Sequence, residues 1–574
     1  MFKCKQLLRR ICVVSYVFLL CGGLVNASNL VSKTNTLIGT QGNGWASGYL
    51  YPGATYPFGM VQFTPTYFTK QLGFVINQLS GAGCDHMGNF PTLPIAGALR
   101  VSPDSILNMQ TPVGKEIGTA GYYAATVDHS IRAELTVTER TGMARYTFSS
   151  KEKQGTVIIG GGVAATPIQV AAIKITGPHS CEGYAEGGAF CGIPTPYKVY
   201  FVAEFDADAE SFGTWKEERL HANHTFAEGS HSGVYFTFPL KEGNQAVQYK
   251  IGVSYVSVEN ARENLRVENP AWDFSAVRQA TQDKWNEYLG KIEVEGDNED
   301  RQMQFYTHLY RSLIHPNVCS DVNGEYMGAD SQVHKTARKF YTSFSNWDTY
   351  RTQTALIAML APEETSDIVM SHYLFAEQSG GGFPRWVLAN IETGVMQGDP
   401  TPILVANAYA FGARTYDPRT LLRTMRYGAE VPGANSQGVL TRPGLEQYLE
   451  KGYYDASILL EYTSSDFAIG RFALQACNDE PVCNWYTQRA MNWKNLFNKE
   501  TGWLQSRNED GSWKRYDADW RESTYKNYFW MVPYDLQGLI DSIGGKEAAE
   551  KRLDEMFRRL DASYGDEWLS LIHI

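Results

Sequence analysis

The spacing of hydrophobic residues changes once along this chain, near residue 270, and this change constrains the fold more than any single motif. Before it, apolar and polar residues alternate, as in SIRAELTVTERTGMARYTF, where one face would carry Ile131, Ala133, Leu135 and Val137. After it, the residues of one face recur every three or four positions, as in Phe274, Val277, Thr281, Trp285 and Tyr288. A period of two describes half-exposed strands, and a period of 3.6 describes helices.

The period of two runs from about residue 35 to residue 267 and predicts an antiparallel β-sandwich. The helical period that follows predicts a long series of helices with functional loops between them, which is typical of an α/α toroid or barrel. Further helices are predicted over 364–375, 402–411, 418–427, 464–476, 480–497 and 546–560. The predicted domains are a sandwich at 28–270 and, at 271–574, a linker helix near Trp285 followed by the barrel.

The first 27 residues have the pattern of a signal peptide. Basic residues come first, an apolar run follows from 11 to 24, and the segment ends in Val25-Asn26-Ala27. The run is shorter than the roughly 20 residues of a membrane-spanning helix, and small residues at its end are typical of a cleavage site. We therefore expect cleavage near Ala27, a secreted or periplasmic mature protein and no membrane span.

The mature chain would carry six cysteines into an oxidising compartment: Cys84, Cys181, Cys191, Cys319, Cys477 and Cys483. The close pairs Cys181/Cys191 and Cys477/Cys483 have spacings that suit loop-closing disulfides. Free buried thiols are the alternative, and the spacings match no zinc site.

Composition narrows the class of ligand. The formal net charge of −11 argues against a nucleic-acid partner, because basic residues are nowhere concentrated enough to neutralise phosphates. Aromatic residues make up 13% of the chain, with 13 Trp and 34 Tyr. Aromatic rings stack on the apolar faces of sugars, so this content fits a carbohydrate protein, although a large aromatic core would produce it as well.

A glycine-rich stretch, IGTQGNGWASGYLYPGATYPFGMVQFTP, occupies residues 38–65. It does not match a phosphate loop, because no Gly-Lys-Ser/Thr follows its glycines. Its aromatic residues and its strand-like ending PFGMVQF are unusual for a linker. It is therefore either an ordered loop whose glycines let the backbone approach a ligand, or a purely structural set of tight turns.

Several long motifs, in order, resemble those of one known family. They are PGATYPFGMVQFTP, GFVINQLSGAGCDHMGNFP, AELTVTERTGMARYTF, SFSNWDTYRTQTAL, GGGFPRWVLANIETGVMQGDPTPILVANAY, LLEYTSSDFAIGRFA and RESTYKNYFWMVPYDLQGLIDSIGG. Together they resemble glycoside hydrolase family 92, the calcium-dependent exo-acting α-mannosidases. The resemblance covers nearly the whole mature chain and implies a β-sandwich followed by an (α/α)6 barrel. It also implies release of terminal mannose from mannose-rich glycans by an inverting mechanism assisted by Ca2+.

Glu522 is the predicted catalytic acid. It lies between Trp520 and an aromatic group that includes Tyr528 and Trp530, and an apolar enclosure raises the pKa of a carboxyl group toward the range that a general acid needs. From the residues alone, a solvated glutamate at a helix start is the alternative. The resemblance implies the acid, because Glu522 matches its position, although the family's usual Gly-Asn-Ala-Trp is replaced here by Ser-Thr-Tyr-Lys.

The segment NWDTYR supplies the predicted sugar-binding residues. Trp347 would stack on a sugar, Asp348 would accept hydrogen bonds from vicinal hydroxyls, and Arg351 would orient the carboxylate. The alternative is a core tryptophan beside a helix-capping aspartate, whereas the resemblance implies the pocket for the terminal mannose. Glu392 and Asp399, in ANIETGVMQGDP, are further candidates, in a motif where the family usually has histidine and this chain has proline.

The chain departs from the family pattern in two further places. The segment TYFTKQL at 66–72 is shorter than usual and lacks a tryptophan that faces the acceptor sugar in the family, so we expect the donor pocket to be better kept than the acceptor side. The family's general-base aspartates and most calcium-site residues lie beyond the equivalent of GDEW, whereas this chain ends in EWLSLIHI. We therefore expect the metal ligands mostly beyond residue 574, and this chain to be an inactive or nearly inactive fragment.

Two other classes of function stay open at this stage. A non-catalytic glycan-binding protein would keep the donor pocket without turnover. An α/α-barrel enzyme acting on another sugar linkage, such as a phosphorylase or lyase, would depend on phosphate or give unsaturated products, and no recognisable phosphate site supports it.

Overall fold

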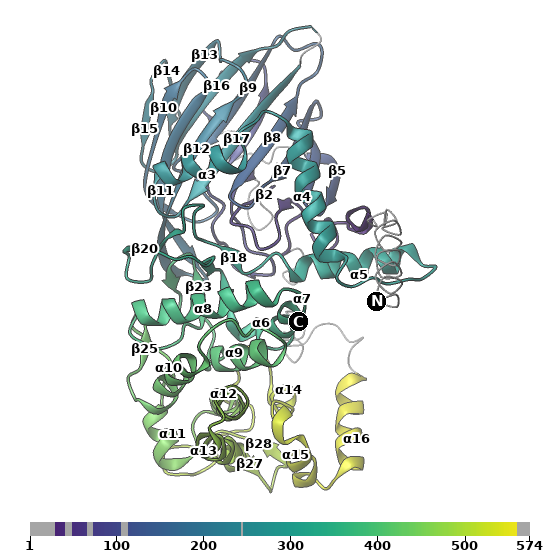
Figure 1. Cartoon of the computed structure of the whole chain (residues 1–574), viewed down its shortest axis with the longest axis vertical. Helices are drawn as coiled ribbons and strands as arrows, with labels where there is room; N and C mark the ends of the chain where they lie inside the picture. Colours follow the sequence, from purple (N-terminus) through teal and green to yellow (C-terminus); the bar gives the residue numbers. More distant parts are fainter. Residues whose placement is uncertain (1–28, 41–48, 66–72, 105–112, 243–244, 559–574) are drawn as a thin grey trace, which may run out of the picture.

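The computed structural model describes residues 29–40, 49–65, 73–104, 113–242 and 245–558. Figure 1 shows a β-sandwich stacked end to end on a helical domain, with helix α4 (Phe274–Leu289) running along the sandwich toward the boundary between them. The predicted signal peptide, the segment 66–72 and the last residues of the chain lie outside the described residues. None of the described helices is long and apolar enough to cross a membrane.

Two antiparallel sheets form the sandwich. The eight-stranded sheet has the order β1 (Ala54–Thr55), β2 (Gln62–Pro65), β3 (Phe74–Val75), β4 (Thr92–Ala96), β9 (Gln154–Gly160), β16 (Ser232–Pro239), β13 (Ser211–Lys216), β14 (Arg219–Ala222). The nine-stranded sheet has the order β15 (Phe226–Glu228), β10 (Ile168–Gly177), β11 (Ser180–Phe190), β12 (Ile193–Phe205), β17 (Ala246–Ser254), β8 (Thr141–Thr147), β7 (Ile131–Val137), β6 (Tyr122–Val127), β5 (Val113–Thr119).

The alternation read from the sequence is seen in β7, where Ile131, Ala133, Leu135 and Val137 are fully buried. Arg132 and Glu134, between them, are partly exposed, and Glu134 binds Arg145 on the neighbouring strand β8. The inward side chains of the two sheets meet in one core, in which Phe63 of β2 packs against Tyr249 of β17. The predicted antiparallel sandwich is therefore confirmed.

The strand-like period was wrong at its end, because residues Val258–Glu268 form helix α3. The side chain of Ser257 caps this helix by accepting a hydrogen bond of 3.0 Å from the backbone N–H of Asn260. Ala261 and Leu265, four residues apart, pack on Val202 of β12. Two of the four buried residues on that face are polar, Asn260 and Asn264, so the apolar helical period was too weak to be recognised.

The helical domain is built from short and long helices: α5 (Glu299–Ser312), α6 (Asn346–Thr349), α7 (Gln353–Leu360), α8 (Pro362–Gln378), α9 (Thr401–Ala410), α10 (Pro418–Glu430), α11 (Leu445–Lys451), α12 (Ala456–Cys477), α13 (Glu480–Ala490), α14 (Tyr525–Tyr528), α15 (Leu536–Ser542) and α16 (Lys546–Phe557). Small hairpins join them: β18 (Asn317–Val318) with β21 (Tyr341–Thr342), β19 (Glu325–Met327) with β20 (Val333–Lys335), β22 (Phe344–Ser345) with β23 (Trp386–Leu388) and β24 (Ile391–Glu392), β25 (Asn435–Ser436) with β26 (Val439–Leu440), and β27 (Phe497–Asn498) with β28 (Trp503–Leu504).

All six helices predicted beyond α5 are present, and the segment 480–497 is α13 followed by a 3-10 turn at Met491–Leu496. Helix α12 lies at the centre of the domain and packs against α9, α10 and α13. The sandwich-then-helices architecture is thus confirmed, while a closed ring of helices is not seen in the part of the chain that the structure describes.

Candidate active site

A cavity of about 1520 Å³ lies where the two domains meet. The sandwich contributes Tyr49, Leu50, the loop 79–84, Phe190 and Cys191 to its lining. The helical domain contributes the segment 343–354, parts of α9 and α12, and residues between Glu522 and Tyr534. This volume is larger than the roughly 300 to 1,000 Å³ of typical small-molecule clefts, and no single domain encloses it.

Trp347, Asp348 and Arg351 all line this cavity. Helix α6 carries Trp347 and Asp348. It is held against α9 by Asn346, whose side-chain amide donates a hydrogen bond of 2.9 Å to Thr401 Oγ1. Asp348 lies inside the helix and accepts a hydrogen bond from Ser345 Oγ. The alternative of a capping aspartate at a helix start is therefore wrong, because α6 begins two residues earlier, at Asn346.

The indole of Trp347 is mostly covered, at 2% exposure, whereas the side chain of Arg351 is 26% exposed. The guanidinium of Arg351 lies 5.0 Å from the centroid of the Trp347 ring and 4.9 Å from that of Tyr350, in cation–π geometry. The positive group that faces the cavity is thus held against two aromatic rings. Sugar stacking on Trp347 stays a prediction.

Glu522 lines the same cavity, in a loop that precedes α14. Its φ of +49° lies in the left-handed region, which a non-glycine residue adopts at some cost and often near functional sites. Tyr528 packs on Trp520 with ring centroids 5.2 Å apart and donates a hydrogen bond to the carbonyl of Arg521. Aromatic side chains from before and after Glu522 therefore contact each other beside its loop, and the aromatic enclosure of its carboxyl group stays a prediction.

Glu392 and Asp399 lie outside the large cavity, beside a void of about 10 Å³ that would hold no more than a water molecule. Glu392 accepts hydrogen bonds of 2.6 Å and 2.9 Å from the backbone N–H groups of Arg385 and Gly394. Asp399 is paired with Arg442 at 2.8 Å. Burial raises the pKa of both carboxyl groups, and Arg385 and Arg442 oppose this effect. These partners favour a supporting role, and direct sugar contact stays a prediction.

Glu461 is a functional candidate that the sequence analysis missed. It is fully buried in α12 and accepts a hydrogen bond of 2.8 Å from Trp347 Nε1. Burial raises its pKa to about 7, against the opposing effects of Arg351 and of the hydrogen bond from Trp347. The available signal was a glutamate in the otherwise apolar run ILLEY.

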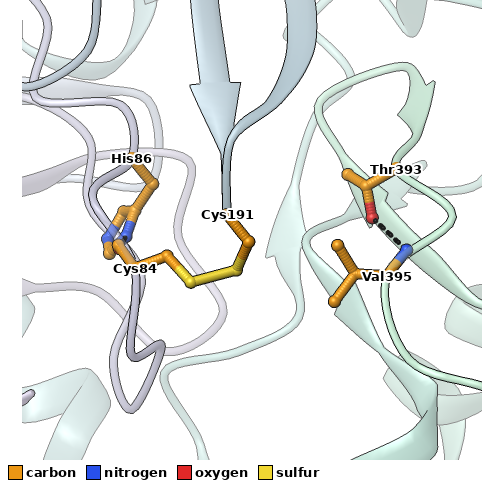
Figure 2. Close-up of a disulfide and its surroundings, with 5 residues drawn as sticks. All are labelled: Cys84, His86, Cys191, Thr393 and Val395. Carbon is orange, nitrogen blue, oxygen red and sulfur yellow. Dashed lines mark hydrogen bonds between the residues drawn. A yellow bond between two sulfur atoms is a disulfide. The ribbon is translucent and has the colours of Figure 1, made fainter.

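A disulfide between Cys84 and Cys191 closes the sandwich side of the cavity, and both residues line it. Figure 2 shows this bond facing the Thr393–Val395 turn of the helical domain, in which the Val395 N–H donates 3.2 Å to Thr393 Oγ1. Phe190, next to Cys191, stacks on Trp386 with ring centroids 4.2 Å apart. The cavity wall is therefore continuous across the two domains.

The predicted disulfides Cys181/Cys191 and Cys477/Cys483 were wrong, because Cys191 pairs with Cys84 and the other three are free and buried. Cys181 and Cys191 lie at opposite ends of the extended strand β11, roughly 30 Å apart at about 3.3 Å per residue. The prediction of this pair failed because it took closeness in sequence for closeness in space, whereas an extended strand holds its two ends far apart.

A buried histidine, His86, and a partly exposed one, His315, hold the loop 79–84, called the rim loop here, which contains Cys84. The backbone N–H of Leu79 donates 2.9 Å to His86 Nε2, and that of Ser80 donates 3.0 Å to His315 Nε2 of the helical domain. Burial lowers the pKa of each imidazole to about 4. Both therefore stay neutral near pH 7 and can accept these bonds.

One described part of the glycine-rich stretch lines the cavity, as a ligand-binding loop would, and another part has a structural role. Within its described part, Tyr49 and Leu50 line the cavity. Gly53 instead packs under the sheet, where a Cβ would lie 2.1 Å from Thr64 Cβ. Residues 41–48, which include three of its six glycines, lie outside the described residues.

The described residues contain no group of three or more His, Cys, Asp or Glu that could hold a metal ion. The calcium ion implied by the resemblance therefore has no such ligand set in this part of the chain, and no step of the chemistry is assigned to it.

Comparison with known families gives the geometry its context. Residues 34–254 match the glycosyl hydrolase family 92 N-terminal domain, and residues 260–570 match the glycosyl hydrolase family 92 catalytic domain. The chain belongs to glycosyl hydrolase family 92. The two matches meet between β17 and α3, where the sandwich ends.

Relatives in family 92 include enzymes of known structure. An α-mannosidase from Bacteroides thetaiotaomicron, also solved with mannoimidazole, has a TM-score of 0.84 and 25% identity over 92% of this chain and 75% of its own. An inverting mannosidase from strain VPI-5482 of that species has a TM-score of 0.83 and 25% identity over 95% of this chain and 76% of its own. A protein of Arthroderma benhamiae described as an uncharacterized secreted glycosidase is 25% identical over 92% of this chain and 74% of its own.

Proposed function

We propose that this family 92 chain acts on α-mannosides and binds the terminal mannose of mannose-rich glycans in the cavity between its domains. The observation that carries the proposal is the convergence of Trp347, Asp348, Arg351 and Glu522 on that cavity. The similarity to two α-mannosidases over more than nine-tenths of the chain supports it.

In the proposed reaction, Glu522 donates a proton to the glycosidic oxygen as the bond to the anomeric carbon breaks. A water molecule attacks that carbon from the opposite face, which inverts its configuration, and it must lose a proton to a base. Among the described residues that line the cavity, Asp348 is the other carboxylate. We assign it to the sugar hydroxyls together with Arg351, and assign the base to none of these residues.

Calcium dependence is proposed from family resemblance alone. A direct test is to add and remove Ca2+ during titration with mannoimidazole, the compound bound by the related enzyme. A change in affinity on chelation would support the proposal, and identical affinities would contradict it.

We also propose that the mature protein is exported, to the periplasm or the medium. The disulfide Cys84–Cys191 supports this proposal, because such bonds persist in oxidising compartments. The fungal relative described as secreted supports it as well.

The alternative is a glycan-binding protein without turnover, which would also account for an inactive chain. Incubation with α-linked mannobioses, with free mannose as the product measured, separates the two functions. An α-mannosidase releases mannose, and Glu522→Gln abolishes release while mannoimidazole still binds. Binding without release from this chain is expected both from the alternative and from an inactive fragment, and a chain extended through the family's general-base motif then decides between them. The absence of both binding and release overturns the proposal. Glu509→Gln, at an exposed loop residue, is the matched control and should behave as wild type.

A further inference from the structure

Glu461 lies behind the cavity wall rather than in it. Its side chain is fully buried and is absent from the cavity lining, whereas Trp347, Tyr350 and Arg351 are part of that lining. One carboxylate oxygen accepts 2.8 Å from the indole N–H of Trp347, and the other lies 3.3 Å from the Tyr350 hydroxyl. A guanidinium nitrogen of Arg351 lies 3.6 Å from the first oxygen.

The Glu461 carboxylate therefore contacts three residues of the cavity wall and restricts their side chains. An indole N–H has a single direction in which to donate, so the bond to Glu461 sets the rotation of the Trp347 ring. The guanidinium of Arg351 rests on that ring and on Tyr350, and its charge is opposed by Glu461. Removal of the carboxylate would leave a buried N–H and a half-buried cation without their acceptor, which is costly in a low-dielectric setting.

The turn around Gly398 packs closely on the Glu461 side chain, which is possible because residue 398 has no Cβ. Gly398 has a φ of +78°, and a Cβ built on it would lie 2.6 Å from Glu461 Cβ. The Ser465 hydroxyl, one helical turn further along α12, contacts the carbonyls of both Asp399 and Glu461. Gly398 and Asp399, which lie outside the cavity lining, therefore have a role in supporting Glu461.

We propose that Glu461 is a positioning residue that fixes Trp347 and Arg351 from behind the cavity wall, in the arrangement that a terminal sugar requires. The identity of the ligand in this inference rests on the proposed function, whereas the contacts of Glu461 do not depend on it.

The charged state of Glu461 follows from the groups that face it. Arg351 lies beside it from the segment after α6, Arg385 acts on it from the loop before β23, and the hydroxyls of Tyr350 and Tyr528 lie near it. Burial and the nearby carboxylate raise the pKa of both phenols, so they stay neutral, and Arg351 stays charged. Glu461 itself has a pKa of about 7. It is thus the group in this cluster that changes charge near neutrality, and below that pH Arg351 keeps the Asp348 carboxylate but loses the opposing charge of Glu461.

The test uses isothermal titration of the full chain with mannoimidazole, together with acrylamide quenching of the fluorescence that is lost in Trp347→Phe. In Glu461→Ala we expect roughly ten- to hundred-fold weaker binding, the order expected when binding groups are misplaced, and easier quenching of Trp347. Glu461→Gln keeps an acceptor for the indole and should lose less affinity. It should also lose the pH dependence of binding that we expect for the wild type between about pH 6 and pH 8.

Tyr462→Phe is the matched control, because it removes a buried hydrogen bond from the next residue of α12, to Pro443 O, without touching Trp347. It should lower thermal stability and leave affinity and quenching unchanged. Equal losses of affinity in the control and in Glu461→Ala would overturn the inference, as would unchanged quenching. If the wild type itself fails to bind mannoimidazole, the proposed function fails, while the quenching comparison still decides the role of Glu461.

Discussion

Trp347 Nε1 and Glu461 Oε1 lie 2.8 Å apart, between two side chains that are 2% and 0% exposed. One residue comes from the short helix α6 and the other from the middle of the long helix α12. The bond therefore ties helix α6 and the segment after it, which carry Asp348 and Arg351, to the central helix of the domain. The shape of the cavity wall depends on this bond as much as on the residues that touch a ligand.

Trp347→Phe removes the donor of this bond and leaves the Glu461 carboxylate without it. We expect the free energy of unfolding to fall by about 1 to 3 kcal/mol, the cost of a buried group that loses its partner. Urea denaturation measures this change. In a double-mutant cycle with Glu461→Gln the two losses should be less than additive, and strict additivity would show that the two side chains do not interact.

Gly398→Ala should disturb Glu461, because the added Cβ would lie 2.6 Å from Glu461 Cβ at a φ of +78°. Gly438→Ala is the control, since Gly438 has a φ of +82° but no atom within 4 Å of the built Cβ. Both substitutions carry the cost of left-handed backbone, about 1 to 2 kcal/mol. Only the first should also weaken mannoimidazole binding, as measured by calorimetry. Equal affinities would argue against the contact.

Loss of the disulfide in the double variant Cys84→Ser/Cys191→Ser should destabilise the protein by about 2 to 5 kcal/mol, because the bond closes a long loop in the unfolded chain. Thermal unfolding with and without a reductant measures this effect. The reductant should lower the Tm of the wild type and leave that of the double variant unchanged. Peptide mapping that links Cys191 to Cys181 would contradict the pairing.

Protonation of His86 and His315 at acidic pH should lower the stability of the fold around the rim loop. Their folded pKa of about 4 lies below the ordinary 6.5, so the unfolded chain takes up protons first. Stability should therefore fall as the pH drops from 6.5 toward 4, by up to about 3 kcal/mol for each histidine. Urea denaturation at several pH values measures the slope. It should be shallower in His315→Gln than in wild type, and the exposed control His129→Gln should match wild type.

Asp399→Ala should act mainly on stability, because it breaks the fully buried pair with Arg442. Loss of one partner of such a pair costs about 3 to 5 kcal/mol. Affinity for mannoimidazole in the folded protein should change by no more than a few-fold. If affinity instead falls by orders of magnitude with stability intact, Asp399 contacts the sugar directly, as the sequence comparison implied.

Much of the fold was predictable from local patterns. Alternation in β7 and the three-to-four spacing in α4 report which face of each element is buried, and burial is what the period encodes. Helix α3 was missed because two of its four buried residues, Asn260 and Asn264, are polar. The family was recognisable because its motifs are long and ordered, and the matches over 34–254 and 260–570 confirm it.

The sequence by itself determined the two periods, the family and four residues that the structure places on one cavity, Trp347, Asp348, Arg351 and Glu522. Only the tertiary structure decided that Cys84 pairs with Cys191, that Asp399 turns away from the cavity to Arg442, and that Glu461 stands behind Trp347. The physical reason is range. Periodicity is a property of neighbouring residues, whereas each of these pairings joins segments whose distance apart is set by the packing of the whole chain.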